Sequence, residues 1–376
     1  MSDHKSLANG SADRGNEPLL SVRDLRVDFR TDDGVIHAVD GVSFEMYPGE
    51  TLCIVGESGS GKTVTGESIT RLIRSPPGEI DGEVVFDGRN LADLSDAELR
   101  EIRGGRIAHV FQNPQNALNP VYTVGWQVAE AVRLHGDVSN AEAREKAIDL
   151  LDRVGIPEAA SRYDDYPHEF SGGQKQRVVV AQALAADPDL LIADEPTTAL
   201  DVTIQAQILR LLAELREEFG MAVLLITHDL SVVAEVADRV VVMYAGKVME
   251  TGDVYDLFEN PAHPYTRALL DCLPGRGTGT RGIPGQLPDP TDPPDGCRFH
   301  PRCPYAVAEC AEGEQPPLYE AGDDHRVSCV YYDGTRDPSV VTESPPPGRD
   351  RERGVGRKQD RGLGLGRTRD PEGDDA

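Results

Sequence analysis

Lysine is scarce in this chain of 376 residues, and so is positive charge in general. Acidic residues number 65 against 38 basic ones, which gives a formal net charge of −27. Binding to nucleic acid needs clustered positive charge, so this balance argues against a nucleic-acid partner. An acid-rich, lysine-poor composition is typical of proteins from salt-accumulating microbes and favours a high-salt cytoplasm, with an ordinary acidic mesophilic protein as the alternative.

Long apolar runs are also missing. The most apolar stretches, such as residues 178–186, fall well short of the ~20 residues that a membrane-spanning helix requires. Residues 1–18 are polar and lack the apolar core of a signal peptide, and we expect them to form a disordered tail. We therefore expect a soluble protein, or one attached to a membrane through a partner.

Strand-like and helix-like patterns alternate along most of the chain. Alternating apolar residues at 19–29 and 35–47 predict an opening hairpin, and residues 113–170 predict mostly helix and loop. From residue 178 onwards strands alternate with helices, which is typical of an α/β protein with a mostly parallel sheet covered on both faces. Residues 335–376 are rich in Pro, Gly, Arg and Asp without periodicity, and predict a second disordered tail.

Residues 56–63, GESGSGKT, match the phosphate-loop pattern G-x-x-x-x-G-K-[ST] in full. An apolar strand precedes the loop and a helical pattern follows it, which argues against a glycine-rich turn without a ligand. Glycines let backbone N–H groups approach phosphates, and the helix that follows favours an anion at its start. Lys62 can reach the β- and γ-phosphates, and the Thr63 hydroxyl can bind Mg²⁺. We therefore expect ATP to be held by Gly56, Glu57, Ser58, Gly59, Ser60, Gly61, Lys62 and Thr63.

Acidic and polar residues end three further apolar strands. Asp194 is placed to hold Mg²⁺, and Glu195 to orient and polarise the attacking water. Such a pair alone is usually a solvated strand end, but beside a phosphate loop it indicates phosphoryl transfer. His228 follows another strand and either is structural or links the γ-phosphate to the water. Gln112 ends a fourth strand, where its amide could contact the metal or the water.

The stretch FSGGQKQR at 170–177 decides the class. Together with GESGSGKT, the glutamine of VFQNP, LLIADEPTTALD and ITHD in this order, it resembles the ATP-binding subunits of ABC transporters over about residues 19–275. The resemblance implies an ABC-type P-loop ATPase with a mostly parallel core sheet, an antiparallel β subdomain and a helical subdomain at about 113–170.

The resemblance also explains a second anion site in the same chain. Residues 171–173 begin a helix, so they offer N–H groups and a positive dipole end to an anion. In the family, the signature of one subunit covers the γ-phosphate held by the other. This implies nucleotide contacts for Ser171, Gly172, Gly173 and Gln174, and an interface position for Asp201.

The family also stacks an aromatic ring on adenine. Phe29 is the candidate by position, although core packing is equally plausible for it. Motion would pass to membrane subunits through a groove near Gln112 and the helical region. Trp126, the only tryptophan, either lines that groove or packs in a core.

Four of the six cysteines gather late in the chain with spacing C-x5-C-x6-C-x18-C. Disulfides are disfavoured in a cytosolic protein, and a cluster of four is unusual for unligated cysteines, so a metal site is the favoured interpretation. The C-x2–4-C knuckles typical of zinc are absent, and four irregularly spaced thiolates suit an iron–sulfur cluster at least as well. The candidate ligands are Cys297, Cys303, Cys310 and Cys329.

DGCRFHPRCPYAVAEC at 295–310, with NPAHPYTRALL at 260–270, resembles the C-terminal extension of dipeptide and oligopeptide importer ATPases. The resemblance implies an extension at 276–334 that holds a structural [4Fe–4S] cluster, with zinc as the alternative. Tyr265 then belongs to this signature and not to catalysis, and His300 is favoured as a surface residue over a ligand.

Together these features predict an ATP-hydrolysing subunit of a peptide importer at the cytoplasmic face of the cell membrane. Its expected partners are a second ATPase subunit, two permeases and an extracellular solute-binding protein. One alternative is an importer of nickel or another small solute. Another is a soluble ABC ATPase, but the long coiled-coil insertions or paired ATPase halves of such proteins are not seen.

Overall fold

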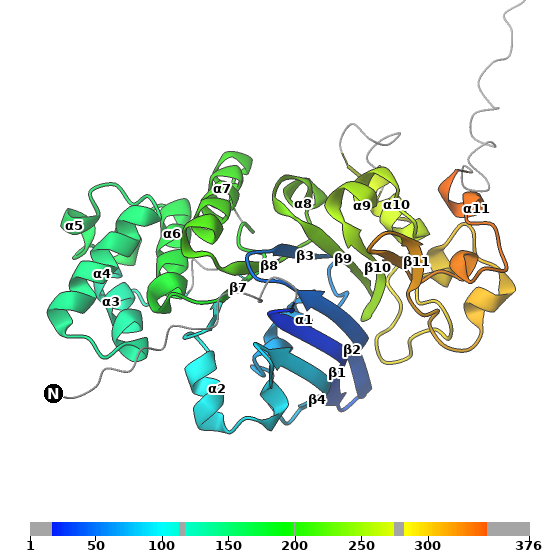
Figure 1. Cartoon of the computed structure of the whole chain (residues 1–376), viewed down its shortest axis with the longest axis horizontal. Helices are drawn as coiled ribbons and strands as arrows, with labels where there is room; N and C mark the ends of the chain where they lie inside the picture. The colour runs from blue at the N-terminus through cyan, green and yellow to red at the C-terminus, as the bar shows by residue number, and fades with distance from the viewer. Residues whose placement is uncertain (1–16, 113–116, 199, 274–281, 344–376) are drawn as a thin grey trace, which may run out of the picture.

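The computed structural model describes residues 17–112, 117–198, 200–273 and 282–343. Within these residues the strands form two sheets, one of eight strands and one of four. Figure 1 shows the smaller sheet below the larger one, with a group of helices at one end and the C-terminal extension at the other.

The central sheet is built on five parallel strands: β3 (Thr51–Val55), β6 (Ile107–Val110), β7 (Leu190–Asp194), β8 (Ala222–Thr227) and β9 (Arg239–Tyr244). β3 pairs in parallel with β8 and β9, and β7 pairs in parallel with β6 and β8. Every residue of β3, β7 and β8 is buried. Strands covered on both faces have continuous apolar sequences of this kind. The predicted mostly parallel core is confirmed.

Helices cover this sheet on both faces. In Figure 1, α7 (Val202–Phe219), α8 (Leu230–Val236), α9 (Val254–Glu259) and α10 (Pro264–Asp271) lie above it, and α1 (Lys62–Ile69) lies below it. α1 contacts strands of both sheets, so it joins the two layers. In the part of the chain that the structure describes, no helix has the length and apolarity that a membrane crossing demands.

The smaller sheet is antiparallel throughout. Its order is β2-β1-β4-β5, formed by β1 (Leu20–Thr31), β2 (Gly34–Met46), β4 (Gly78–Phe86) and β5 (Arg89–Asn90). The predicted hairpin is the β1–β2 pair, and the predicted antiparallel subdomain is confirmed. The short helix α2 (Asp96–Ile102) follows this sheet.

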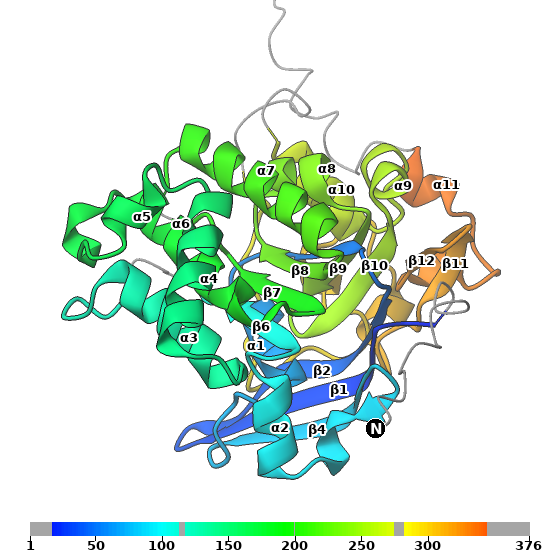
Figure 2. The same cartoon turned by 60° about the vertical axis from the view of Figure 1, so that its left-hand side comes forward.

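A group of helices lies at the β6 end of the central sheet, as Figure 2 shows. It comprises α3 (Val124–His135), α4 (Asn140–Arg153), α5 (Ala159–Arg162) and α6 (Gly172–Ala183). α4 begins with a capping box, because the Ser139 hydroxyl accepts from the Glu142 N–H and the Glu142 carboxylate accepts from the Ser139 N–H.

Three antiparallel strands, the last two of them from the C-terminal extension, continue the central sheet. β10 (Lys247–Asp253) pairs antiparallel with β9, and β12 (His325–Val327) and β11 (Tyr319–Gly322) add two more antiparallel strands. The full order is β11-β12-β10-β9-β3-β8-β7-β6. Beyond them, α11 (Ser339–Thr342) carries a fully buried Val341.

The order of α11 corrects one boundary. Disorder predicted for residues 335–376 is wrong for the first part of that range, because Val341 packs with Tyr305, Val327 and Tyr331 in a small apolar cluster. The rest of that predicted tail, and nearly all of the predicted tail at 1–18, lie outside the described residues.

Candidate nucleotide site

The loop between β3 and α1 has room only for glycine at two positions. A Cβ atom on Gly56 would lie 2.1 Å from the carbonyl oxygen of Met243, and one on Gly61 would lie 2.3 Å from that of Ala38. Gly61 also has φ of 97°, in the left-handed region. Both glycines therefore fix how closely the loop packs on its neighbours.

Lys62, the first residue of α1, turns back over the loop. Its Nζ atom donates to the carbonyl oxygens of Gly56 at 2.8 Å and Glu57 at 2.9 Å. Burial lowers the pKa of this ammonium group, while the carboxylates of Glu195, Asp194 and Glu57 oppose that shift. A phosphate oxygen would be a favourable new partner for a buried cation of this kind.

A cavity of about 490 Å³ opens beside this loop. Eight of the residues predicted to contact the nucleotide or act on it line this cavity: Phe29, Ser58, Gly59, Gly61, Lys62, Thr63, Gln112 and Glu195. Phe29 is partly buried and also packs on the apolar layer between the two sheets, so both interpretations of this ring are compatible with its place.

Glu195 is the centre of a hydrogen-bonded cluster at the end of β7. Its carboxylate accepts from Gln112 Nε2 and Thr198 Oγ1 and meets His228 Nδ1, each at 2.9 Å. Burial by itself would raise the pKa of Glu195, but the hydrogen bonds from His228, Thr198 and Gln112 outweigh it and lower the pKa. The structure therefore brings three of the predicted catalytic residues, Glu195, His228 and Gln112, into direct contact.

Asp194 lies deeper, against the first turn of α1. Its Oδ1 atom is buried without a hydrogen-bond partner, while a hydrogen bond joins the carboxylate to Thr63. Burial, with Glu195 and Glu67 nearby, raises the pKa of Asp194 to about 6. A divalent cation would satisfy the orphaned oxygen and favour the ionised form, so Asp194 and Thr63 fit a Mg²⁺ site. The amide N–H of Gln112 donates to Glu195, and its expected contact with the same cation stays a prediction.

Glu57 is bonded to residues outside the phosphate loop. Its backbone N–H donates to the Tyr265 hydroxyl at 2.9 Å, and its carboxylate is paired with Arg302. Gly56, Glu57 and Ser60 are not among the described residues that line the cavity. The backbone N–H, the carbonyl oxygen and the carboxylate of Glu57 thus all have partners within the protein, and contact between Glu57 and the nucleotide stays a prediction.

The signature lies away from this cavity. The Ser171 hydroxyl accepts from the Gln174 N–H, and the Gln174 amide oxygen accepts from the Ser171 N–H, so these residues cap α6. Asp201 caps α7 in the same manner, by accepting from Ile204. Among the described residues that line the cavity, none comes from 171–174. A nucleotide bound there would not touch the signature of its own chain.

Comparison with known proteins agrees with this geometry. Residues 39–198 match the ABC transporter family model, and residues 249–310 match the model for the oligopeptide/dipeptide transporter C-terminal region. A probable peptide ABC transporter ATP-binding protein of Sinorhizobium fredii is 52% identical over 316 residues, which is 83% of this chain and 94% of that protein. The oligopeptide transport ATP-binding protein of Bacillus subtilis is 49% identical, with 82% and 87% covered. The chain belongs to the ATP-binding proteins of ABC transporters.

Solved structures of other ABC ATPases have the same fold as this chain. A dimeric ATP-binding cassette in a post-hydrolysis state, bound to ADP and Pi, matches with a TM-score of 0.56 and 32% identity. The match covers 62% of this chain and 98% of that one. A part of a Clostridium perfringens ABC transporter complex matches with the same TM-score and 30% identity, over 65% of this chain and 92% of that one.

The extension of this ABC ATPase reaches the nucleotide cavity, which sequence reasoning missed. Residues 287–290 and Pro293 line the cavity, and so does Arg298. Tyr265, assigned only to a family signature, bonds the phosphate loop. No local signal could have found these contacts, since their partners lie more than two hundred positions away in the sequence.

The late cysteines are brought together, and all four are free thiols. Burial raises the pKa of Cys297 to about 11 and those of Cys303 and Cys329 to about 12, and the ionisation of Cys329 is coupled to the other three cysteines. Backbone N–H groups point at three of the sulfurs: Phe299 and His300 at Cys297, Tyr305 at Cys303, and Tyr331 at Cys329. Nevertheless, the described residues contain no group of three or more His, Cys, Asp or Glu arranged to hold a metal ion.

Proposed function

We propose that this ABC ATPase hydrolyses ATP to drive the uptake of dipeptides or oligopeptides through partner permeases. The observation that carries the peptide assignment is the oligopeptide/dipeptide-type C-terminal region at 249–310, because the nucleotide motifs are shared by transporters of many solutes. The relatives named for peptide import match this chain over most of their own length. The domain division that we infer is a nucleotide-binding part at 19–275 and an extension at 276–334.

The proposed chemistry assigns a task to each side chain of the site. Glu195 accepts the proton of the attacking water, and His228 and Gln112 hold its carboxylate in place. Lys62 neutralises the β- and γ-phosphates. Mg²⁺ held by Thr63, Asp194 and Gln112 would neutralise charge that develops on the phosphates.

We infer that two nucleotide domains close on two ATP molecules. The Ser171–Gln174 cap of one domain would meet the γ-phosphate in the other, which is supported by the absence of residues 171–174 from the described residues that line the cavity of their own chain. Asp201 would lie in the same interface, and Phe29 would stack on adenine. Hydrolysis would then release the two domains from each other.

The partners follow from the same proposal. The chain would act at the cytoplasmic face of the cell membrane with a second ATPase subunit, two permeases and an extracellular solute-binding protein. Exposed Val121 and the stacked pair Tyr122 and Trp126 offer an apolar surface for a permease at the start of α3.

Reconstitution tests this function directly. The chain would be inserted with its permeases, its partner ATPase and the binding protein into vesicles, and uptake of labelled peptide would be measured with and without ATP. We expect ATP-dependent peptide uptake that is lost in Glu195→Gln. Uptake of nickel but not of peptide would replace the peptide assignment, and ATP hydrolysis insensitive to the permeases would favour a soluble ATPase.

We further propose that Cys297, Cys303, Cys310 and Cys329 hold a structural [4Fe–4S] cluster, with zinc as the alternative. The support is that four free thiols act on one another electrostatically and that backbone N–H groups are aimed at three of their sulfurs, as in sites that hold thiolates. Anaerobically purified protein should be brown and contain iron and sulfide in equal amounts. A colourless protein with stoichiometric zinc would assign zinc, and a protein without metal would refute the site.

The acidic composition carries a separate proposal, that the protein works in a salt-rich cytoplasm. The net charge of −27 makes self-repulsion strong in dilute buffer, and salt screens it. The melting temperature should therefore rise steadily from dilute buffer into molar KCl. A melting temperature independent of KCl would contradict this proposal.

A further inference from the structure

The buried side chain of Arg302, in the extension, forms an ion pair with Glu57 of the phosphate loop. Arg302 Nη1 lies 2.6 Å from Glu57 Oε2, and Nη2 lies 3.1 Å from Oε1, so the pair is bidentate. The guanidinium also donates to the carbonyl oxygens of Pro284 and Ile283, both at 2.9 Å, and to the Tyr244 hydroxyl at 3.2 Å. The Arg302 side chain is only 5% exposed. A planar guanidinium with this many hydrogen bonds has little freedom to move.

Arg302 pairs with Glu57, whose negative charge would disfavour a polyanion bound at the phosphate loop. Glu57 is the second residue of a loop that must receive a polyanion, and its carboxylate acts electrostatically on the Lys62 ammonium. Lys62 Nζ already donates to the Glu57 carbonyl oxygen at 2.9 Å. Without Arg302, the Glu57 carboxylate would be free to pair with Lys62 and would compete with phosphate for this cation.

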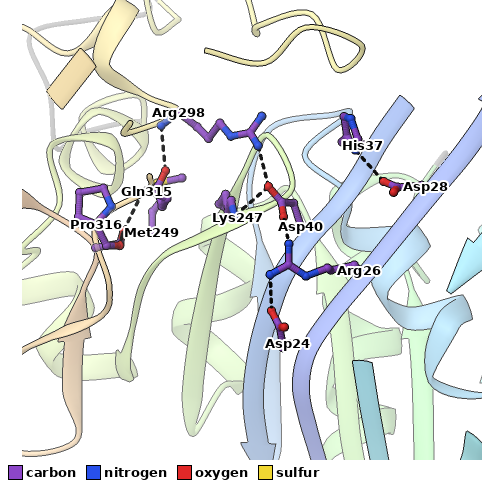
Figure 3. A network of polar contacts seen from close by, with 11 residues as sticks. Asp24, Arg26, Asp28, His37, Asp40, Lys247, Met249, Arg298, Gln315 and Pro316 are labelled. Atoms are coloured by element: carbon purple, nitrogen blue, oxygen red, sulfur yellow. Dashed lines mark hydrogen bonds and ion pairs between the residues drawn. The ribbon is translucent and has the colours of Figure 1, made fainter. Parts of the chain in front are cut away.

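Arg298 joins the extension to the cavity at a second place. Its Nη2 atom lies 2.7 Å from Asp40 Oδ2 on β2, beside Lys247, as Figure 3 shows. The backbone N–H of Arg298 donates to the side-chain oxygen of Gln315, and this bond helps to hold the Arg298 backbone in place. Close by, the His37 N–H donates to the carbonyl oxygen of Pro290, at the edge of the cavity. The extension therefore contacts two parts of the site, the phosphate loop through Arg302 and strand β2 through Arg298 and Pro290.

We propose that Arg302 is a positioning residue of the ATP site, which holds the Glu57 carboxylate away from Lys62 so that Lys62 is free for the phosphates. This inference rests on the proposed function of the cavity as an ATP site. It gives the extension a task in nucleotide binding that does not depend on which metal, if any, its cysteines hold.

Equilibrium titration of the full chain with fluorescent ATP, ADP and AMP analogues tests the proposal. Arg302→Met should weaken ATP binding about tenfold, the size of one charge-assisted contact, and should affect AMP much less. The double variant Glu57→Gln/Arg302→Met should recover most of the lost affinity, because no unpaired carboxylate remains. A merely structural role predicts equal losses for all three nucleotides and no recovery in the double variant.

Control variants distinguish a specific effect of Arg302 from a general effect of removing an ion pair and from misfolding. Arg336→Met removes an Arg–Glu pair between a residue just after the extension and Glu309 within it, and should leave ATP affinity unchanged. If Arg302→Met does not fold, Arg302→Lys keeps the charge but loses the fork, and a loss confined to the phosphate-rich nucleotides is then expected. ATP affinity that is unchanged, or lost equally with AMP affinity, would overturn the inference. Wild-type protein that binds no ATP would instead refute the proposed function.

Discussion

Replacing Asp194 by asparagine should stabilise the metal-free protein and at the same time abolish Mg²⁺-dependent hydrolysis. Burial, together with Glu195 and Glu67, raises the pKa of Asp194 from 3.8 to about 6, even though Thr63 and Lys62 oppose the shift. The buried Oδ1 atom has no partner. The carboxylate therefore weakens the fold whenever it is ionised without a cation, and asparagine carries no such charge.

The direction in which the unfolding free energy changes with pH follows from proton linkage. Because the folded state binds this proton more tightly than the unfolded chain, the stabilising contribution of protonated Asp194 is present at low pH. It is lost as the pH rises from the ordinary value towards about 6. At pH 8 the loss is complete, and it corresponds to on the order of 3 kcal/mol of unfolding free energy. Asp194→Asn should recover much of this at pH 8 and progressively less towards pH 5.

Urea denaturation in EDTA between pH 5 and pH 8 measures the effect, and Asp152→Asn on the exposed face of α4 is the matched control. MgATP should then stabilise the wild type, and much less so the Asp194 variant, because binding to the folded state alone shifts the unfolding equilibrium. A variant that is no more stable than the wild type at pH 8, or whose gain does not shrink towards pH 5, would refute the argument from burial.

Three further changes probe other parts of the molecule. Glu195→Gln should reduce phosphate release at least about 100-fold by removing the proton acceptor, while ATP-bound dimers accumulate in size-exclusion chromatography; undiminished turnover would exclude Glu195 as the base. Tyr265→Phe removes the acceptor of a phosphate-loop N–H and should cost about 1–3 kcal/mol in urea denaturation, whereas Tyr255→Phe on the exposed side of α9 should cost nothing measurable. Cys329→Ser should lose bound metal in elemental analysis, and Cys272→Ser should keep it; equal metal in both would remove Cys329 from the site.

The parts of the site that the sequence predicts are those whose geometry is set by neighbours in the chain. The phosphate loop follows from glycine spacing, because Gly61 must adopt a left-handed conformation and pack against Ala38. The helix that begins at residues 171–173 was expected from the local sequence, and its Ser171 cap needs only a partner three positions further on. Such arrangements need no knowledge of the rest of the fold.

The remaining parts depend on contacts that no local pattern encodes. Arg302 meets Glu57 across 245 positions, and Tyr265 meets the same residue across 208. Both contacts arise because β10 and β12 continue the central sheet and bring the extension back to the loop. Helix α11 was missed for a related reason. Val341 lies in a segment of disorder-like composition, and only a tertiary pocket between Tyr305 and Tyr331 orders it.

These long-range contacts place positive charge near the cavity of a strongly acidic chain. A protein with a net charge of −27 must bind an anionic ligand, and two acidic residues lie next to residues that line its cavity: Glu57 precedes Ser58, and Asp40 pairs with Arg298. The extension supplies Arg302 to Glu57, and it adds Arg298 to Lys247 and Arg26 around Asp40. Salt screens the long-range repulsion between ATP and the acidic surface, but it screens buried pairs much less. In high salt the two arginines would therefore continue to shape the site, and ATP affinity should depend on them there as well.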